Sequence, residues 1–188
     1  SNISPLNERG GGFDTGPGNC LMDSWFCQHH PNHSKSYDAS GAWAASGRVH
    51  DGLLRGMLED AYFSKKPPKS TGREYFNMAW LKSHLQALQD NPPAADVQAT
   101  LSQLTATSLA AAIIDTMPDV RDVPICGGGR GNDHLMRNAQ AALNPREQAD
   151  VRVMPCEAWG FDGDAIEAAA FAWLAYRRVA ALKGNQPD

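Results

Sequence analysis

The sequence lacks the features typical of nucleic-acid-binding or membrane-spanning proteins. Basic residues do not outnumber acidic ones, because 17 Lys and Arg face 21 Asp and Glu, for a net charge of −4. Nucleic acid and anionic membranes are therefore not expected as partners. No apolar run reaches the roughly 20 residues that a membrane-spanning helix requires. Residues 1–4 show neither the basic nor the apolar region of a signal peptide.

Cysteine is scarce, and no two cysteines form a C-x-x-C pair. Each lies in an apolar or helical context, which predicts buried, reduced thiols in a cytoplasmic protein. The four are Cys20, Cys27, Cys126 and Cys156.

One cysteine lies near a group of histidines. Cys27 precedes His29, His30 and His33, but this spacing matches no familiar zinc arrangement. The intervening Pro31-Asn32 signals a turn. We therefore expect a solvated loop here and assign no metal ligands.

The composition is that of an ordinary globular chain. Of the 188 residues, 42% are hydrophobic and 20% are charged, so a core is available. This length fits one domain or one lobe of a larger enzyme.

Glycine is concentrated in the segment Gly10–Asn19, which holds five glycines, one proline and a single acid, Asp14. A glycine-rich turn that leads into a helix presents free N–H groups, which suit an anion such as phosphate. Asp14 would repel phosphate and is better suited to handling a proton, a nucleophile or a metal beside it. The segment therefore suggests phosphoryl-transfer chemistry.

Hydrophobic periodicity predicts helices over much of the chain. A helix is expected from Leu21 to Gln28, with Asn19 as its cap. Two capping boxes, Thr71–Glu74 and Asp164–Glu167, are expected to open the helices that follow them. Helical patterns also cover residues 53–62, 76–88, 97–114, 135–143 and 168–182, the last with Phe171, Leu174 and Ala175 facing the core.

Strands are expected at Asn2–Leu6, Val123–Cys126 and Val151–Met154. Because strand–loop–helix units recur, the fold class is predicted to be α/β with a large helical share.

The tripeptide Asp14-Thr15-Gly16 also occurs in the catalytic loops of aspartic proteases. Those enzymes consist almost entirely of strands and pair two such loops. Here the tripeptide leads into a helix, and most of the remaining chain is helical, so the protease interpretation is set aside.

A second glycine loop, Gly127–Asn132, lies between a predicted strand and a predicted helix. It suits either a turn that contacts a nucleotide or an ordinary tight turn. The segment is not a G-x-G-x-x-G fingerprint with a downstream ribose acid, and no P-loop motif occurs in the chain.

Glu157 follows the last predicted strand, at the end where open α/β sheets place ligand contacts. A surface carboxylate with no ligand is the alternative.

Taken together, these segments resemble the anhydro-N-acetylmuramic acid kinase family. The matches occur in the family's order and span nearly the whole chain, which makes them more specific than any single loop. They are Gly12–Asn19, Tyr37-Asp38 with Gly41, Ala45–Gly47, Ser70–Phe76, Val123–Gly129, Asn132 with His134–Met136, and Glu167-Ala168 with Phe171–Ala175.

The resemblance implies an RNase H-like lobe of the actin/hexokinase/Hsp70 type, with a mixed β-sheet flanked by helices and ATP bound between two lobes. It also implies a bacterial cytoplasmic enzyme that uses ATP with Mg²⁺. Water would open the 1,6-anhydro ring of anhydro-N-acetylmuramic acid while O6 takes the γ-phosphate. The product would be N-acetylmuramic acid 6-phosphate, in peptidoglycan recycling.

The resemblance also implies roles for individual residues. Asp14 matches the family's general base, which activates the water that attacks C1, and a carboxylate on a rigid turn suits that task. Glu157 is expected to contact the sugar. Phosphate and sugar contacts are expected from Thr15, Gly16, Gly18 and Asn19, and nucleotide contacts from Gly127, Gly128, Gly129 and Asn132.

The chain also departs from the family pattern. The Gly-Thr-Ser-x-Asp-Gly phosphate loop of the family's N-terminal lobe has no match here, and the family pattern continues beyond Gly184–Pro187. We therefore expect residues 1–188 to form the C-terminal lobe, with the N-terminal lobe as its partner and a homodimer left open. Alone, the lobe is expected to be inactive. Another sugar kinase of the superfamily and a non-catalytic nucleotide-binding lobe are the alternatives.

Overall fold

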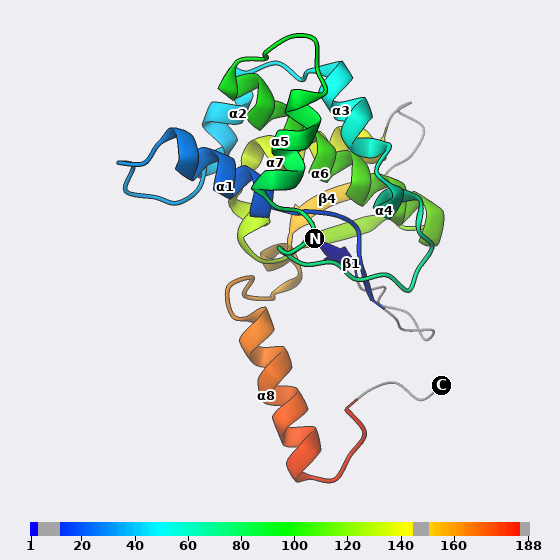
Figure 1. Cartoon of the computed structure of the whole chain (residues 1–188). Coiled ribbons are helices and arrows are strands. Elements are labelled where there is room, and N and C mark those ends of the chain that lie inside the picture. Colours follow the sequence, from blue (N-terminus) through cyan, green and yellow to red (C-terminus); the bar gives the residue numbers. More distant parts are fainter. Residues whose placement is uncertain (4–11, 145–150, 185–188) are drawn as a thin grey trace.

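The computed structural model describes residues 1–3, 12–144 and 151–184. Helices dominate this part of the chain, with short strands between them (Figure 1). The predicted α/β class with a large helical share is confirmed. In chain order the elements are β1 (Asn2–Ile3), β2 (Phe13–Asp14), α1 (Cys20–His29), η1 (Ala39–Gly41), α2 (Ala42–Ser46), α3 (Asp51–Leu58), α4 (Ala61–Ser64), α5 (Met78–Gln86), α6 (Ala94–Thr116), β3 (Asp122–Ile125), η2 (Gly128–Gly131), α7 (Asp133–Leu143), β4 (Arg152–Pro155), η3 (Cys156–Trp159) and α8 (Ile166–Val179).

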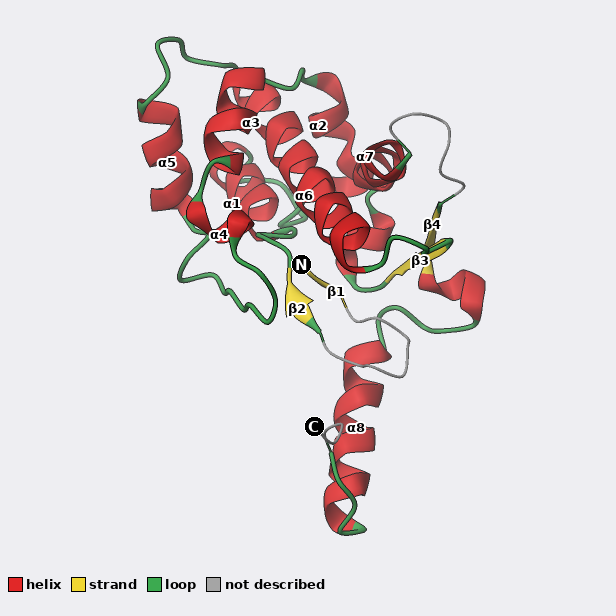
Figure 2. Cartoon of the chain, turned by 90° about the vertical axis from the view of Figure 1, so that its right-hand side faces the viewer, coloured by secondary structure: helices red, strands yellow, loops and turns green. Residues whose placement is uncertain are grey.

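Helix α6 is the centre of the molecule, and α1, α2, α3 and α7 pack around it (Figure 2). All residues from Gln98 to Ser102 are buried, so the helix is enclosed on every side. Many of its buried side chains are small, which lets neighbouring helices come close. By length and composition α6 could cross a membrane, but 72% of its most apolar window is buried inside the structure, as in a core helix.

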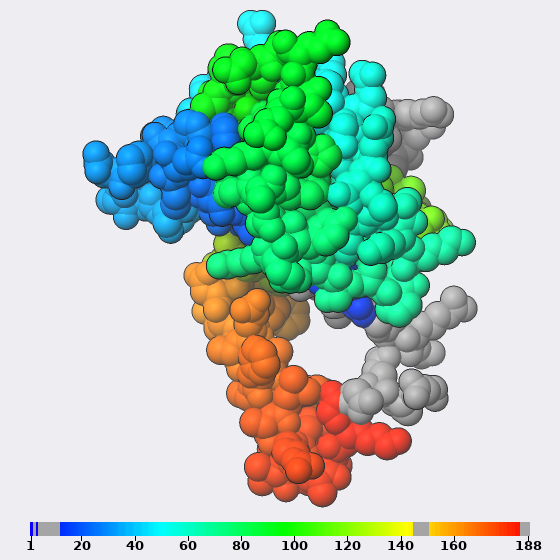
Figure 3. Space-filling view, in the orientation of Figure 1, coloured from blue at the N-terminus to red at the C-terminus, as the bar shows by residue number. Residues whose placement is uncertain are grey.

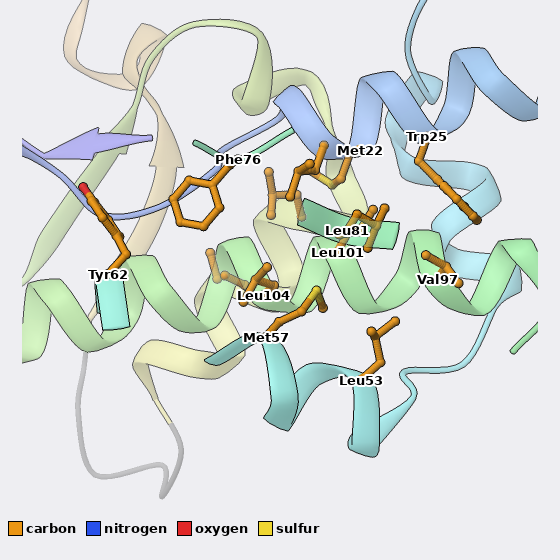
Figure 4. Packing of buried hydrophobic residues seen from close by; sticks show 14 residues of the cluster. Met22, Trp25, Leu53, Met57, Tyr62, Phe76, Leu81, Val97, Leu101 and Leu104 are labelled. Atoms are coloured by element: carbon orange, nitrogen blue, oxygen red, sulfur yellow. The ribbon is translucent and has the colours of Figure 1, made fainter. Parts of the chain in front are cut away.

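The main hydrophobic cluster forms where side chains from α1, α3 and α5 converge on α6 (Figure 4). Leu101 and Leu104 of α6 share this cluster with Met57 of α3 and Leu81 of α5, and all four are essentially fully buried. Each such side chain contributes about 1.5–3 kcal/mol by leaving water. The apolar positions whose spacing predicted these helices are therefore the positions that pack against α6.

The strands form two separate two-stranded sheets in the part of the chain that the structure describes. Strands β1 and β2 are antiparallel, whereas β3 and β4 are parallel and are joined through α7, as a parallel pair requires. The expected mixed sheet is therefore not seen as one sheet in this part. Strands β1 and β2 lie below the C-terminal end of α6, and β3 and β4 lie beside it (Figure 2). Ile3, Val123 and Val151 share a second hydrophobic cluster with Ile113 of α6.

The predicted strands at Val123–Cys126 and Val151–Met154 correspond to β3 and β4. Of the strand expected at Asn2–Leu6, only Asn2–Ile3 is described, and residues 4–6 lie outside the described residues. The helix expected over residues 53–62 is divided into α3 and α4. The cause is Asp60, whose carboxylate accepts a hydrogen bond from Tyr62 N (2.8 Å) and so starts a new helix.

Both predicted capping boxes are wrong, because tertiary contacts hold these segments in other arrangements; the Thr71 hydroxyl has no hydrogen-bond partner among the described residues. The N–H of Thr71 binds Asp14, and α5 begins only at Met78, where the Asn77 side chain accepts from Ala79 N and Trp80 N. The carboxylate of Asp164 pairs with Arg130, and α8 has no side-chain cap.

Helix α8 projects from the helical body (Figures 1 and 3), and none of its residues is buried. The expectation that Phe171, Leu174 and Ala175 face a core is therefore wrong for the described chain. Phe171 is 71% exposed. The helix instead displays a set of large apolar side chains, Phe171, Trp173, Leu174, Tyr176 and Val179.

Stability should depend strongly on the glycine that follows α2. A Cβ at Gly47 would overlap the carbonyl oxygen of Ala95 in α6, and backbone cannot yield as a flexible side chain can. We expect Gly47→Ala to lower the free energy of unfolding by about 1–3 kcal/mol.

The matched control is Gly56→Ala in the interior of α3, where the nearest atom to an added Cβ is His84 Nδ1 at 3.9 Å. It should raise stability by about 0.5–1 kcal/mol, because alanine favours the helix. Urea unfolding followed by tryptophan fluorescence measures both. Equal effects of the two substitutions would contradict the close approach of α2 and α6.

Candidate active site

Asp14 is held in place from three sides. Its backbone N–H donates to the carbonyl of Lys69 (3.0 Å), and its own carbonyl accepts from the Tyr62 hydroxyl (2.8 Å). Its carboxylate oxygen Oδ2 accepts from Ser70 Oγ (3.1 Å) and from Thr71 N (3.0 Å). Burial, followed by the nearby charge of Asp14, raises the pKa of Tyr62 to about 12, so this hydroxyl remains a donor.

Asp14 lies at an open depression with a volume of about 230 Å³. Within the described residues no group donates to Oδ1, so this oxygen is available to a ligand or a water molecule. Lys69 extends along one wall and donates from Nζ to the carbonyls of Tyr62 and Phe63, both at 3.3 Å. The depression is lined by Gly12, Phe13, Asp14, Lys69 and Ser70.

Sequence reasoning did not assign Ser70 and Thr71 to the site. It placed Thr71 in a helix cap, because Thr71-x-x-Glu74 has the local pattern of a capping box. The signal that could have found them is their place in the run Ser70–Phe76, which matches the family but does not cap a helix here. The structure brings both residues onto the carboxylate of Asp14 across more than 50 residues of sequence.

The rest of the first glycine loop is packed into the protein. Thr15 is 1% exposed, and Gly16 has no room for a Cβ because Phe63 and Ser108 would both be 3.0 Å away. The carbonyl of Gly18 accepts from Thr105 Oγ1 of α6 at 2.9 Å. These contacts anchor the loop on α6, and the expected ligand contacts of Thr15, Gly16 and Gly18 stay a prediction. Gly10 and Gly11 lie outside the described residues.

Asn19 joins the two glycine loops. It does not cap α1 with its side chain as predicted, because its backbone is already helical (φ −81°, ψ −14°). Its amide lies instead beside the second loop: a Cβ on Gly128 would be 3.7 Å from Asn19 Nδ2, and one on Gly129 would be 3.4 Å from Asn19 Oδ1. The structure therefore brings together parts of both loops that the sequence separates by more than 100 residues.

The second loop is a tight turn between β3 and α7. Gly127 has φ +71°, a conformation that favours glycine, and Arg130 N donates to its carbonyl (3.2 Å). Asn132 caps α7 by accepting from Leu135 N (2.9 Å). Both interpretations of the loop stay compatible with this geometry, because Gly128 and Gly129 have ordinary φ values and face little besides Asn19 and Leu135.

Arg130 ties three segments together. Its guanidinium binds Glu157 Oε1 (2.6 Å), both carboxylate oxygens of Asp164 (2.8 Å each) and the carbonyl of Gly127 (3.0 Å). The hydrogen bonds from Arg130 hold the pKa of Glu157 and that of Asp164 below their usual values. Glu157 Oε1 also accepts from Gly163 N (3.3 Å). Through Arg130, Glu157 thus helps to hold the second glycine loop in place. Its expected contact with the sugar stays a prediction.

Asp23 is a further carboxylate near the site that sequence reasoning did not single out. It lies in the first turn of α1, and its N–H donates to the carbonyl of Asn19 (2.9 Å). Burial raises the pKa of Asp23 to about 6, against an opposing effect of Arg73 and with a smaller contribution from Asp38. The sequence signal that could have identified Asp23 is its position one helical turn after Asn19.

The raised pKa makes Asp23 a source of instability at neutral pH. The folded protein prefers the protonated carboxyl, so this contribution grows as pH rises from about 4 to about 6 and is absent below that window. We expect Asp23→Asn to stabilise the protein by about 1 kcal/mol at pH 7.5, after allowance for solvent screening, and to have no such effect at pH 4.

Thermal unfolding at the two pH values measures this difference. Asp51→Asn is the matched control, because Asp51 is also in the first turn of a helix but is exposed. It should weaken α3 slightly at pH 7.5 through loss of a favourable charge at the helix N-terminus. An Asp23→Asn effect that is equal at both pH values would contradict the raised pKa.

Comparison with known proteins agrees with the family that the motifs of this chain resemble. The family model described as anhydro-N-acetylmuramic acid kinase matches residues 1–188. Three relatives that carry this name come from Chromohalobacter salexigens (50% identity over 182 residues), Pseudomonas paraeruginosa (47% over 177) and Coxiella burnetii (44% over 177). Each alignment covers 94% of this chain, but 46%, 46% and 45% of the respective relative. The chain thus spans a little under half the length of these curated relatives. On the match over its full length, the chain belongs to the anhydro-N-acetylmuramic acid kinase family.

Proposed function

We propose that this chain is the C-terminal lobe of an ATP-dependent anhydro-N-acetylmuramic acid kinase. In the complete enzyme, water opens the 1,6-anhydro ring and O6 receives the γ-phosphate of ATP. The product is N-acetylmuramic acid 6-phosphate, formed in the cytoplasm during peptidoglycan recycling. The observation that carries the proposal is the placement of Asp14, whose carboxylate is fixed through Oδ2 and which lines an open depression.

In this proposal Asp14 is the general base. Ser70 and Thr71 hold Oδ2 and so fix the direction in which Oδ1 points. A base oriented in this way can remove a proton from a water at the anomeric carbon without first having to reorient its carboxylate. Lys69, on the same wall of the depression, supplies a positive charge near the place where phosphate would lie.

The second glycine loop is proposed to contact ATP. Gly127 needs its left-handed backbone, but neither backbone strain nor close packing explains why Gly128 and Gly129 lack side chains. Approach of a ligand to the backbone would explain it. The amide of Asn19 lies beside both glycines, so it would face the phosphates from the first loop.

ATP would arrive as its Mg²⁺ complex, because phosphoryl transfer needs the negative charge on the phosphates to be neutralised. The described residues contain no cluster of three or more His, Cys, Asp or Glu side chains. Mg²⁺ in kinases keeps several waters and binds largely through substrate phosphates, so such a cluster is not required. We assign no residue of this chain to the ion.

The lobe assignment is supported by α8 and by chain length. The apolar side chains of α8 are uncovered in the described structure, which fits a surface that packs on another part of a longer protein. The relatives are long enough to contain such a part, since this chain spans less than half the length of each. The β3–α7–β4 unit is compatible with an RNase H-like lobe, which we include in the proposal.

The role of Asp14 is tested in the full-length protein. Asp14→Asn should lower kcat by a factor of about 10²–10⁴ and leave the KM for ATP nearly unchanged, because asparagine still accepts from Ser70 and Thr71 but cannot take a proton. ADP release with anhydro-N-acetylmuramic acid is the measurement, and the 188-residue chain alone should give none.

Asp119→Asn is the control, since Asp119 is exposed. Undiminished turnover in Asp14→Asn would overturn the assignment of the base. Turnover of other sugars with none of the anhydro sugar would instead favour a different sugar kinase. Binding of ATP and sugar with no turnover in the unmodified protein would favour a non-catalytic lobe.

The nucleotide loop is tested by Gly128→Ala in the full-length protein. The added methyl group meets only Asn19 Nδ2, at an ordinary 3.7 Å, so stability should change by no more than about 0.5 kcal/mol. If ATP approaches the backbone here, its KM should rise about tenfold or more. Gly56→Ala in α3 is the control and should leave the KM unchanged. An unchanged KM in Gly128→Ala would contradict the contact.

A further inference from the structure

Two of the four cysteines lie next to each other at the ends of neighbouring strands. Strands β3 and β4 are paired in parallel, and their last paired residues are Ile125 and Pro155. Cys126 and Cys156 each follow directly, Cys156 as the first residue of η3, so the end of the strand pair places the two residues side by side. The strand spacing of about 4.8 Å is within the Cα separations of about 4.4–6.8 Å that a disulfide spans.

The two thiols differ in their access to solvent. Cys126 is exposed, whereas Cys156 is 0% exposed. Burial, followed by the influence of the neighbouring Cys126 side chain, raises the pKa of Cys156 to about 11. The Cys156 thiol donates to Glu157 Oε2 (3.8 Å). All four cysteines are free, as predicted, but the prediction that all are buried holds only for Cys156: Cys20 is half-buried, and Cys27 and Cys126 are exposed.

We propose that Cys126 and Cys156 form a redox site, in which an oxidant of the peroxide class converts the two thiols into a reversible intramolecular disulfide. The proposal requires an exposed thiol that meets the oxidant and a second thiol within reach, and the structure provides one of each. Disulfides of cytoplasmic proteins, where they occur, are mostly transient or redox-sensing.

The chemistry balances with hydrogen peroxide as the oxidant. The Cys126 thiolate attacks one peroxide oxygen, the O–O bond breaks, and a sulfenic acid and a hydroxide ion form; the hydroxide takes up the proton that the Cys126 thiol had released, which gives one water. The Cys156 sulfur then attacks the sulfenic sulfur, a second water leaves with the proton of Cys156, and the S–S bond forms. The two sulfurs together lose two electrons, which the peroxide gains. A dithiol such as dithiothreitol reverses the step by exchange.

The site is directly attached to the second glycine loop, because Cys126 precedes Gly127 and Cys156 precedes Glu157. A disulfide would therefore tie the start of this loop to η3, next to the ion pair of Arg130 with Glu157. If the loop contacts ATP, bound ATP should also shield Cys126 from the oxidant. This coupling rests on the proposed function, whereas the formation of the disulfide does not.

The experiment uses the full-length protein treated with hydrogen peroxide, followed by alkylation and non-reducing peptide mapping by mass spectrometry. We expect a Cys126–Cys156 cross-linked peptide that disappears after dithiothreitol. Cys126→Ser and Cys156→Ser should each abolish it, and Cys126→Ser should also prevent sulfenic acid formation at this site. Cys27→Ser is the matched control, since Cys27 is exposed but its thiol donates to the carbonyl of Ser36 (3.2 Å) in another loop.

The outcomes separate the redox site from the nucleotide site. Failure to find the cross-link, or oxidation of Cys126 only to the sulfinic acid, overturns the redox proposal whatever the enzyme's activity. When the cross-link forms, Mg-ATP at ten times its Kd should slow its formation about tenfold, because only the unliganded loop reacts. Equal rates with and without Mg-ATP would leave the disulfide established and contradict the contact between this loop and ATP.

Discussion

The attachment of the first glycine loop to the core depends on a buried hydrogen bond, from the hydroxyl of Thr105 to the carbonyl of Gly18. It attaches the first glycine loop to α6, the helix around which the others pack. A buried carbonyl left without a donor costs about 1–3 kcal/mol, so the loop has little freedom to leave this position. The bond holds the segment between Asp14 and Asn19 against a buried part of α6. The carboxylate of Asp14 is fixed in addition by its hydrogen bonds from Ser70 and Thr71.

The sequence was sufficient to predict the elements whose causes are local. Helices α1, α6 and α7 and strands β3 and β4 follow from hydrophobic periodicity and from the glycines and prolines that flank them. Helix ends were predicted less well, because their polar residues have competing partners. Thr71 and Asp164 have the local pattern of caps, yet one donates to Asp14 and the other pairs with Arg130. Local patterns do not reveal such long-range competition.

The same limit applies to the site. Each glycine loop could be recognised in the sequence, and Asp14 could be singled out as the acid within the first. The meeting of the loops at Asn19 could not, because it depends on how α1 and α7 pack on α6. The hydrogen bonds from Ser70 and Thr71 to Asp14 could not be recognised in the sequence either, since more than 50 residues separate them from Asp14. The local sequence indicates which chemical groups are present, and tertiary packing determines which of them come into contact.

The guanidinium of Arg130 has a mechanical consequence for α8. It joins the carbonyl of Gly127 to Asp164, which lies two residues before α8 begins. No side chain of α8 is buried, so none anchors the helix in the core. The start of the helix is connected to the glycine loop through Arg130. A rotation of α8 must either carry this loop with it or break the contacts of Arg130. A surface that covers the exposed apolar side chains of α8 would therefore act on the position of the glycine loop through Arg130.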